Sequence, residues 1–270
     1  MSKNTINVEK LVSFLGYGNP AADYWFIGIE EGLDDKVAND CLNGNCNNLI
    51  EQLIVRSKFK NVMDLKDAHK LLGIEKYFRE NRPPLQRTWE GIIKLILDQL
   101  PVSSTDLHAY ANYKESLRTF QKKNLGSVDG NMFLAELFPL PYPRVHGSYS
   151  GLYKFLSDSR NSQFIDNSSS KSALNIIADK SDYLSWIKED RILGLKRLIK
   201  ENKPKVVVCY GKTQWHLYKE VFSDITSWEK PKTGSPFERG SFESTKVVLT
   251  PHLVAREMNG KWPELWKFIR

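Results

Sequence analysis

The sequence predicts an α/β protein with three layers, in which helices flank a central, mostly parallel β-sheet. Nearly continuous apolar runs, typical of strands buried on both faces, begin near Tyr24, Lys205 and Lys246. Segments with helical apolar spacing separate these runs, and such alternation is typical of a parallel sheet covered by helices. We expect one domain over residues 1–270, with a helical insertion at about 33–82 and a polar loop at about 158–180.

Strands are expected where short apolar runs end in glycine, proline or a charged turn. They are Tyr24–Ile29, Met132–Phe138, Lys205–Gly211 and Val247–Leu249, with a short hairpin at Phe237–Phe242. The first strand is expected to end in a tight acidic turn, with Glu30 and Glu31 between Gly28 and Gly32. Pro139, Pro141 and Pro143 are expected to close the second strand.

Helices are expected where apolar residues recur at intervals of three and four, and Thr88 can cap one of them. They are Thr5–Leu15, Asn47–Lys58, Asp64–Leu72, Trp89–Leu100, Tyr110–Lys122, Asp182–Asn202, Lys212–Phe222 and Pro263–Ile269. The Ser- and Asn-rich stretch Ser159–Lys171 is typical of an exposed loop.

Charge and cysteine content limit the environment and the partners. The formal net charge of +7 favours an anionic partner such as nucleic acid, although a lysine-rich surface gives the same number. Three scattered cysteines argue against a disulfide scaffold and for a reducing cytoplasm, and they offer no metal-site spacing. No apolar run approaches the roughly 20 residues of a membrane span, and the N-terminus lacks a signal-peptide core. We therefore expect a cytoplasmic monomer without metal or cofactor.

Two chemically active side-chain types follow separate strands. The first strand leads to the carboxylates Glu30 and Glu31, and the strand Lys246–Thr250 leads to His252. In open parallel sheets, ligands bind beyond the carboxyl ends of the strands. The sequence therefore predicts one site built from a carboxylate and a histidine that are far apart in the chain.

The motifs, taken in this order, resemble those of the uracil-DNA glycosylase superfamily. The matching segments are WFIGIEEG (25–32), RTWEGIIKLI (87–96), NMFLAELFPLPYP (131–143), PKVVVCYGKTQW (204–215) and VVLTPHLVAREMNGKW (247–262). The NGKW ending is most similar to the single-strand-selective branch. The resemblance implies a parallel sheet flanked by helices and an enzyme that flips a nucleotide out of DNA and releases its base.

The resemblance implies a role for each residue at the strand ends. Glu30 would place the attacking water or stabilise the cationic sugar, while Glu31 stands where the family often has proline, and either could act. His252 would donate a hydrogen bond to O2 of the departing base, although a lone histidine is often structural. The residues after it, Leu253-Val254-Ala255, replace the family's Pro-Ser-Pro.

Glu136 is the clearest departure from the family pattern. Uracil-removing members carry an asparagine there, whereas an ionised glutamate only accepts hydrogen bonds and suits the N4–H edge of cytosine. A strand-end carboxylate in a plain ion pair would explain it equally. Gly28 would also lie at the base, and Tyr142, Trp89 and Phe138 are the candidates for stacking on it.

Further residues are candidates for DNA contact. Arg256, Met258 and Asn259 would supply the wedge that fills the gap left by the flipped base. The remaining candidates for binding the DNA backbone are Gly211, Lys212, Thr213, Arg144, His146 and Lys261.

The resemblance and Glu136 together predict a monofunctional DNA glycosylase that acts on a modified pyrimidine, with preference for a modified cytosine such as those of bacteriophage DNA. Two alternatives remain open. One is uracil excision in DNA repair, and the other is a nucleic-acid-binding protein of the same fold that has lost catalysis.

Overall fold

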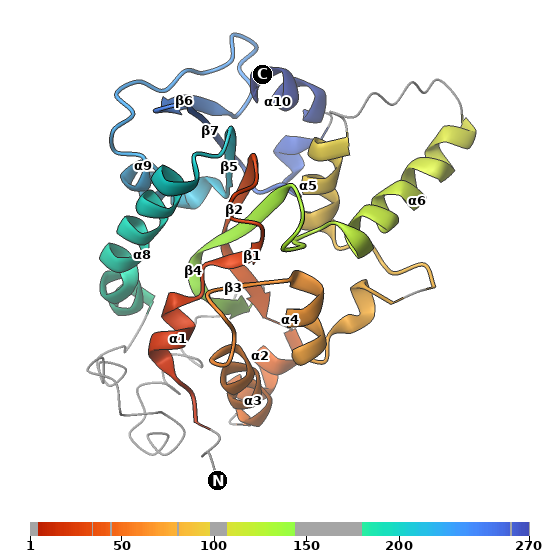
Figure 1. Cartoon of the computed structure of the whole chain (residues 1–270), viewed down its shortest axis with the longest axis vertical. Helices are drawn as coiled ribbons and strands as arrows, with labels where there is room; N and C mark the ends of the chain where they lie inside the picture. The colour runs from red at the N-terminus through yellow and green to blue at the C-terminus, as the bar shows by residue number, and fades with distance from the viewer. Residues whose placement is uncertain are drawn as a thin grey trace. The chain divides into compact units, whose positions relative to one another are not determined.

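The protein, described by a computed structural model over residues 5–33, 35–43, 45–79, 81–97, 107–143, 180–259 and 261–269, contains one mixed β-sheet (Figure 1). Its strands are β1 (Gly16–Gly18), β2 (Tyr24–Leu33), β3 (Val62–Met63), β4 (Met132–Pro143), β5 (Val206–Tyr210), β6 (Glu238–Phe242) and β7 (Thr245–Thr250). They are ordered β3-β1-β4-β2-β5-β7-β6. The centre is parallel, since β5 pairs in parallel with both β2 and β7, and antiparallel pairs lie outside it.

Helices flank the sheet, which confirms the predicted α/β class. The α-helices are α1 (Val8–Ser13), α2 (Asp35–Leu42), α3 (Asn47–Arg56), α4 (Leu65–Leu71), α5 (Arg87–Leu97), α6 (Leu107–Lys123), α8 (Lys180–Asn202), α9 (Trp215–Val221) and α10 (Trp262–Ile269). Single 3-10 turns are η1 (Glu75–Tyr77), η4 (Lys212–Gln214) and η5 (Arg256–Met258). Helices lie in all eight segments where they were expected, whereas α2 and the turns η1 and η5 were not expected individually. The polar loop expected at about 158–180 lies outside the described residues.

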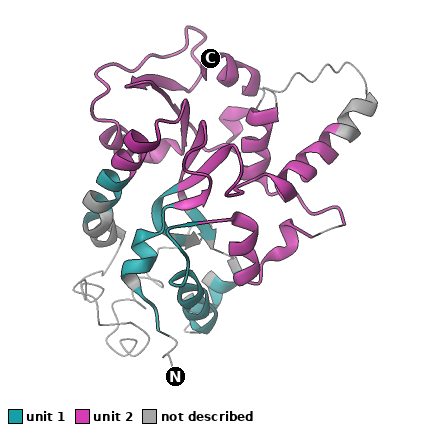
Figure 2. Cartoon of the chain, viewed as in Figure 1, with its two compact units in different colours: residues 1–15, 30–62, 136–194 teal, residues 16–29, 63–135, 195–270 magenta. Residues whose placement is uncertain are grey.

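The chain groups into two compact units, shown in Figure 2. Unit 1 comprises residues 1–15, 30–62 and 136–194, and unit 2 comprises residues 16–29, 63–135 and 195–270. The helical insertion expected at about 33–82 is divided between them. In unit 2 every residue of β5 is buried, as a strand covered on both faces requires.

Two strands are longer than predicted. β2 continues through Glu30, Glu31 and Gly32 to Leu33, so the acidic turn expected after Ile29 is wrong. β4 continues to Pro143 through the prolines expected to end it. Those prolines are two residues apart, and alternate residues of a strand direct their N–H groups to the same side. Three prolines in this spacing therefore remove donors from one edge of β4 only.

The cysteine expectation also needs correction. Cys41, near the end of α2, forms a disulfide with Cys46, which precedes α3, and their Cα atoms are 4.1 Å apart. The turn between the two helices brings these positions together, and the spacing alone did not reveal that turn. The third cysteine, Cys209, is a buried free thiol whose burial raises its pKa well above the usual value.

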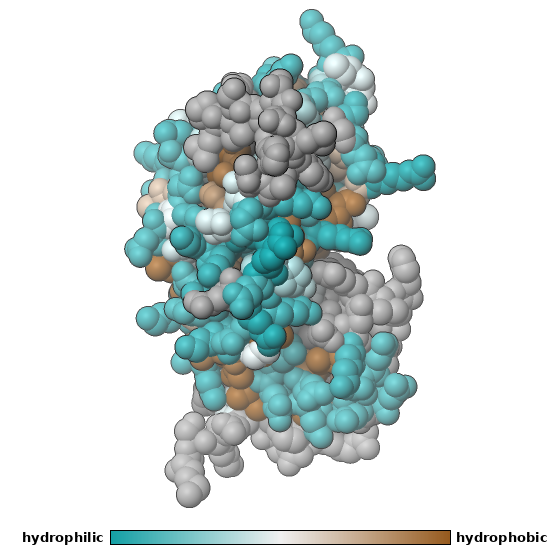
Figure 3. Space-filling view, turned by 90° about the vertical axis from the view of Figure 1, so that its right-hand side faces the viewer, coloured by the Kyte–Doolittle hydropathy of each residue, from teal (hydrophilic) through white to brown (hydrophobic). Residues whose placement is uncertain are grey.

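The surface offers little continuous apolar area on the side shown in Figure 3. The coloured residues there are mostly hydrophilic, and the hydrophobic ones form small separate groups. Within the described part of the chain, no helix combines the length and the apolar character needed to cross a membrane.

Candidate active site

His252 lies beyond the carboxyl end of β7. β7 pairs in parallel with β5 as far as Tyr210↔Thr250, and the Gly211 amide then donates to the Thr250 carbonyl over 2.9 Å. His252 follows Thr250 by two residues. Because parallel neighbours end at the same edge of a sheet, the Gly211 turn and the His252 loop share that edge (Figure 1).

The imidazole of His252 has a defined orientation. The Val254 amide donates to its Nδ1 over 3.4 Å. The ring is half-buried and stands edge-on to the ring of Tyr210, with 5.7 Å between centroids and 82° between planes. A neutral imidazole that accepts at Nδ1 carries its proton on Nε2. This tautomer provides the donor that the sequence interpretation requires.

The loop that carries His252 is anchored on both sides. Trp215 Nε1 donates to the Thr250 carbonyl over 3.2 Å, and the Thr250 hydroxyl lies 3.3 Å from the Met258 sulfur. The amide of Ala255 donates to the His252 carbonyl over 2.7 Å, which makes the loop a tight turn. The loop is therefore held at its base and presents its tip to solvent.

The predicted wedge needs one correction. Met258 is only 1% exposed, so it packs in the core and cannot project into a base stack. Arg256 and Asn259 are exposed, as a DNA contact requires. Val254 is 48% exposed although it is apolar and stands two residues after His252. Val254 was not predicted as a site residue. The feature that could have identified it is an apolar residue two positions after the histidine.

The turn after β5 has no room for a side chain at Gly211. Its backbone has a φ of 122°, and a Cβ placed there would lie 2.4 Å from Cδ1 of Ile29. The helix expected from Lys212 onward begins as the 3-10 turn η4, with α9 after it. Lys212 and Thr213 are exposed, and Lys212 Nζ lies 3.5 Å from a carboxylate oxygen of Glu257.

Of the two carboxylates of β2, Glu31 forms an ion pair within unit 1. An oxygen of Glu31 accepts from Arg56 Nη1 over 2.5 Å, and the Arg56 side chain is only 6% exposed. This ion pair gives Glu31 a structural role in unit 1. Glu30 follows Ile29 directly in the chain, and its backbone is part of β2. Between the two, Glu30 is therefore the better candidate for the catalytic carboxylate.

The base-reading candidates of β4 belong to unit 1. Glu136 is half-buried, and its backbone carbonyl accepts from Arg191. Phe138 is 2% exposed and packs in the core. Tyr142 lies within β4, while Arg144 and His146 lie outside the described residues.

Trp89 lies at the start of α5 in unit 2. Its amide donates to the side chain of Gln86 over 2.8 Å, and its ring packs against His69, Tyr77 and Phe78. Trp89 is therefore part of an aromatic cluster in unit 2.

Within unit 2, the structure brings together part of the predicted set. The turn at Gly211 and Lys212 and the loop of His252 meet at the sheet edge, with buried Gly28 on the neighbouring strand β2. Glu30, Glu31, Glu136, Phe138 and Tyr142 belong to unit 1.

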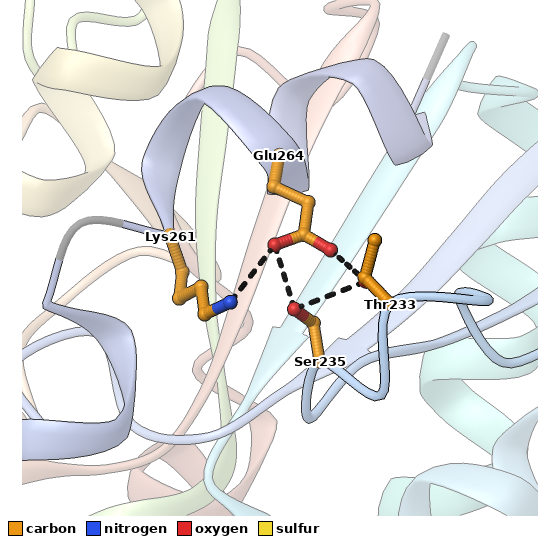
Figure 4. Close-up of polar contacts among 4 residues, drawn as sticks. All are labelled: Thr233, Ser235, Lys261 and Glu264. Atoms are coloured by element: carbon orange, nitrogen blue, oxygen red, sulfur yellow. Dashed lines mark hydrogen bonds and ion pairs between the residues drawn. The ribbon is translucent and has the colours of Figure 1, made fainter.

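Lys261, the last predicted DNA contact, takes part in a polar cluster (Figure 4). Glu264, in the first turn of α10, accepts from Ser235 over 2.6 Å and from Lys261 over 3.1 Å, and also from Thr233. These contacts fix the loop around residue 234 to the start of α10 and engage the ammonium group of Lys261.

We expect Glu264 to stabilise the fold at neutral pH and to lose this effect in acid. Hydrogen bonds from Ser235 and Thr233, with Lys261 nearby, lower its pKa from 4.5 to about 2. A folded-state pKa below the unfolded one gives stabilisation that is present above about pH 4.5 and disappears between about pH 4.5 and 2. Thermal unfolding should show Glu264→Gln melting below the native protein at pH 7, with the difference shrinking towards pH 2.

Glu201→Gln is the matched control, since Glu201 is 60% exposed and lies 3.9 Å from Arg197. Its melting temperature should stay near the native value throughout. A Glu264→Gln difference that is the same at pH 7 and pH 3 would contradict the assignment.

A cavity of about 500 Å³ lies at the opposite end of β7. Ser227, Ser241 and Lys246 are among its lining residues. Lys246 is near the start of β7 whereas His252 follows its end, so this cavity is not a base pocket next to His252.

No protein-family model matches the sequence, and the searches of curated proteins and of solved structures found no significant match either.

Proposed function

We propose that this protein is a DNA glycosylase that hydrolyses the N-glycosidic bond of a flipped-out, modified pyrimidine and leaves an abasic site. The observation that supports this most is the His252 loop at the carboxyl edge of β5 and β7. The amide of Val254 on Nδ1 makes Nε2 the proton carrier of the neutral ring. A neutral donor of this kind suits the developing negative charge on a departing base.

In the proposed reaction, the bond between C1′ and the base nitrogen breaks with its electron pair going to the base, and a water oxygen adds to C1′. The proton that this water loses passes to Glu30, and the base anion takes up a proton from solvent. Glu30 positions this water and stabilises the cationic sugar, and His252 Nε2–H donates to O2 of the departing base. Glu30 takes this role because Glu31 already forms an ion pair with Arg56. Water is the only co-reactant, so the reaction needs no cofactor.

Glu136 is proposed to read the base. Its carboxylate would accept from the N4–H of cytosine, whereas the O4 of uracil would be repelled. This favours a modified cytosine, and bacteriophage DNA is a source of such bases. Defence against that DNA is therefore the biological setting that we propose.

The contacts with the DNA strand are proposed to come from exposed groups at the sheet edge. Lys212 and Thr213 follow the Gly211 turn and would bind phosphates. Val254 is the apolar side chain that would enter the gap in the base stack, with Arg256 and Asn259 beside it. We propose that the protein acts as a monomer on DNA in the cytoplasm. The Cys41–Cys46 disulfide argues against that compartment, because disulfides are rare in a reducing cytoplasm.

The test is base release from duplexes that contain uracil, 5-hydroxymethylcytosine or glucosylated 5-hydroxymethylcytosine, followed by alkaline cleavage of abasic sites. The native protein should act on a modified cytosine. Glu30→Gln and His252→Gln should each lower the single-turnover rate about 100-fold or more, because each removes a group that acts in the transition state.

Glu243→Gln and His216→Gln make the same chemical changes at exposed positions, in the β6–β7 turn and on α9, and should leave the rate unchanged. Release of uracil alone would contradict the modified-cytosine substrate and favour the alternative of uracil excision in DNA repair. DNA binding without release of any base would favour the alternative of a catalytically inactive binding protein.

A further inference from the structure

The parallel strands β2 and β5 are joined by a side chain where their pairing ends. Their register runs from Tyr24↔Val206 to Ile27↔Cys209, while β5 and β7 stay paired one residue further, to Tyr210↔Thr250. The hydroxyl of Tyr218, on α9, lies 3.2 Å from the Ile27 carbonyl and 3.1 Å from the Tyr210 carbonyl. The single O–H proton is shared between the two carbonyls, so one hydroxyl group links both strands at the point where their pairing ends.

The burial of Tyr218 makes this contact rigid and costly to lose. The side chain is fully buried, and its ring has only two side-chain torsions to restrict. A buried hydroxyl without partners is costly, and so are buried carbonyls that lose one. Phenylalanine at this position would fill the same space but could not donate a hydrogen bond to either carbonyl.

The segment that Tyr218 holds is the one that leads to the proposed catalytic carboxylate. Ile27 is followed by Gly28, Ile29 and Glu30. Ile29 packs closely against Gly211: a Cβ added to Gly211 would lie 2.4 Å from Cδ1 of Ile29. Tyr210 precedes Gly211 and stands edge-on to His252. The hydroxyl thus connects the backbone before Glu30 with the backbone beside His252.

We propose that Tyr218 is a positioning residue of the site, whose hydroxyl fixes the Ile27–Ile29 segment of β2 against the Gly211 turn. This inference rests on the proposed glycosylase function for its catalytic consequence. Without the hydroxyl, β2 would lose this link to β5 next to Ile27, and shifts of about 1 Å in a catalytic group can cost about 100-fold in rate.

The test compares Tyr218→Phe with the native full-length protein. Amide hydrogen exchange should become at least about 10-fold faster in the segments 28–32 and 210–214, because their anchoring bond is lost. On a substrate that the native protein cleaves, the single-turnover rate should fall about 10- to 100-fold while the Kd for DNA changes less than about 3-fold. If Tyr218 were merely structural, its substitution would lower the melting temperature. The cleavage rate, measured at a temperature well below melting, would then stay unchanged.

Tyr77→Phe is the matched control, because Tyr77 lies in the turn η1 and is not at the strand ends. It should change neither exchange in these segments nor the rate. If Tyr218→Phe fails to fold, Ile29→Val removes part of the contact with Gly211 and should speed exchange in the same segments.

The outcomes separate this inference from the proposed function. If the native protein releases no base, the function fails, and the exchange measurement still tests the anchoring. Unchanged exchange in Tyr218→Phe, or faster exchange with an unaltered rate on a cleaved substrate, would overturn the positioning role.

Discussion

Replacing Arg191 with methionine should lower the free energy of unfolding by about 3–5 kcal/mol, because several buried carbonyls would lose a charged hydrogen-bond donor. Arg191 is only 3% exposed and lies in α8. Its guanidinium donates to the carbonyls of Phe14 over 2.6 Å and of Glu136 over 2.5 Å. It also reaches the carbonyls of Leu15 at 3.3 Å and Leu137 at 3.2 Å. One side chain thus joins the end of α1 to β4 within unit 1.

The expected cost follows from the carbonyls that the substitution would leave without this donor. Each buried polar group that loses its partner costs about 1–3 kcal/mol, and methionine fills the space without replacing any donor. Lysine should not rescue the loss, because a single ammonium group cannot reproduce the planar fork of guanidinium donors.

Urea unfolding of Arg191→Met and Arg197→Met would check this prediction. Arg197 lies on the same helix, its side chain is 79% exposed, and it lies 3.9 Å from Glu201. The control should change stability by less than about 0.5 kcal/mol. Equal losses in the two variants would show that Arg191 does not have the role described.

Hydrophobic pattern alone was sufficient for much of the fold. The run at 205–210 and the run that ends at Thr250 became the parallel strands β5 and β7, because an apolar stretch of this length is stable only when covered on both faces. Their order along the chain then placed Gly211 and His252 at one edge. The histidine loop could therefore be located from sequence.

The errors came from partners that are distant in the sequence. Glu31 was expected in a turn because adjacent carboxylates and glycines favour turns, and nothing local indicated that Arg56 of α3 would pair with it. Met258 was expected in the wedge with Arg256 and Asn259, yet it contacts the hydroxyl of Thr250 in the core. Local pattern describes propensity, whereas such contacts depend on the completed fold.

Gly211→Ala should destabilise the protein by about 2–6 kcal/mol, since a strained backbone and an overpacked contact cost about 1–3 kcal/mol each. Gly211 has a φ of 122° and a ψ of 89°, a conformation that residues with a Cβ rarely adopt. The added methyl would also lie 2.4 Å from Cδ1 and 2.6 Å from Cγ1 of Ile29. Neither problem can be relieved without moving the turn that precedes Lys212.

A double-mutant cycle with Ile29→Ala separates the two causes. Removing Cγ1 and Cδ1 of Ile29 should relieve the steric part of the Gly211→Ala cost and leave the backbone part, which would appear as a coupling of about 1–3 kcal/mol. Gly194→Ala is the matched control, because Gly194 lies in α8 with open space around its missing Cβ. In a helix, alanine should stabilise the protein by about 0.5–1 kcal/mol. If Gly211→Ala proved as harmless as this control, the close packing of β2 against the Gly211 turn would be refuted, and with it the geometry on which the proposed site depends.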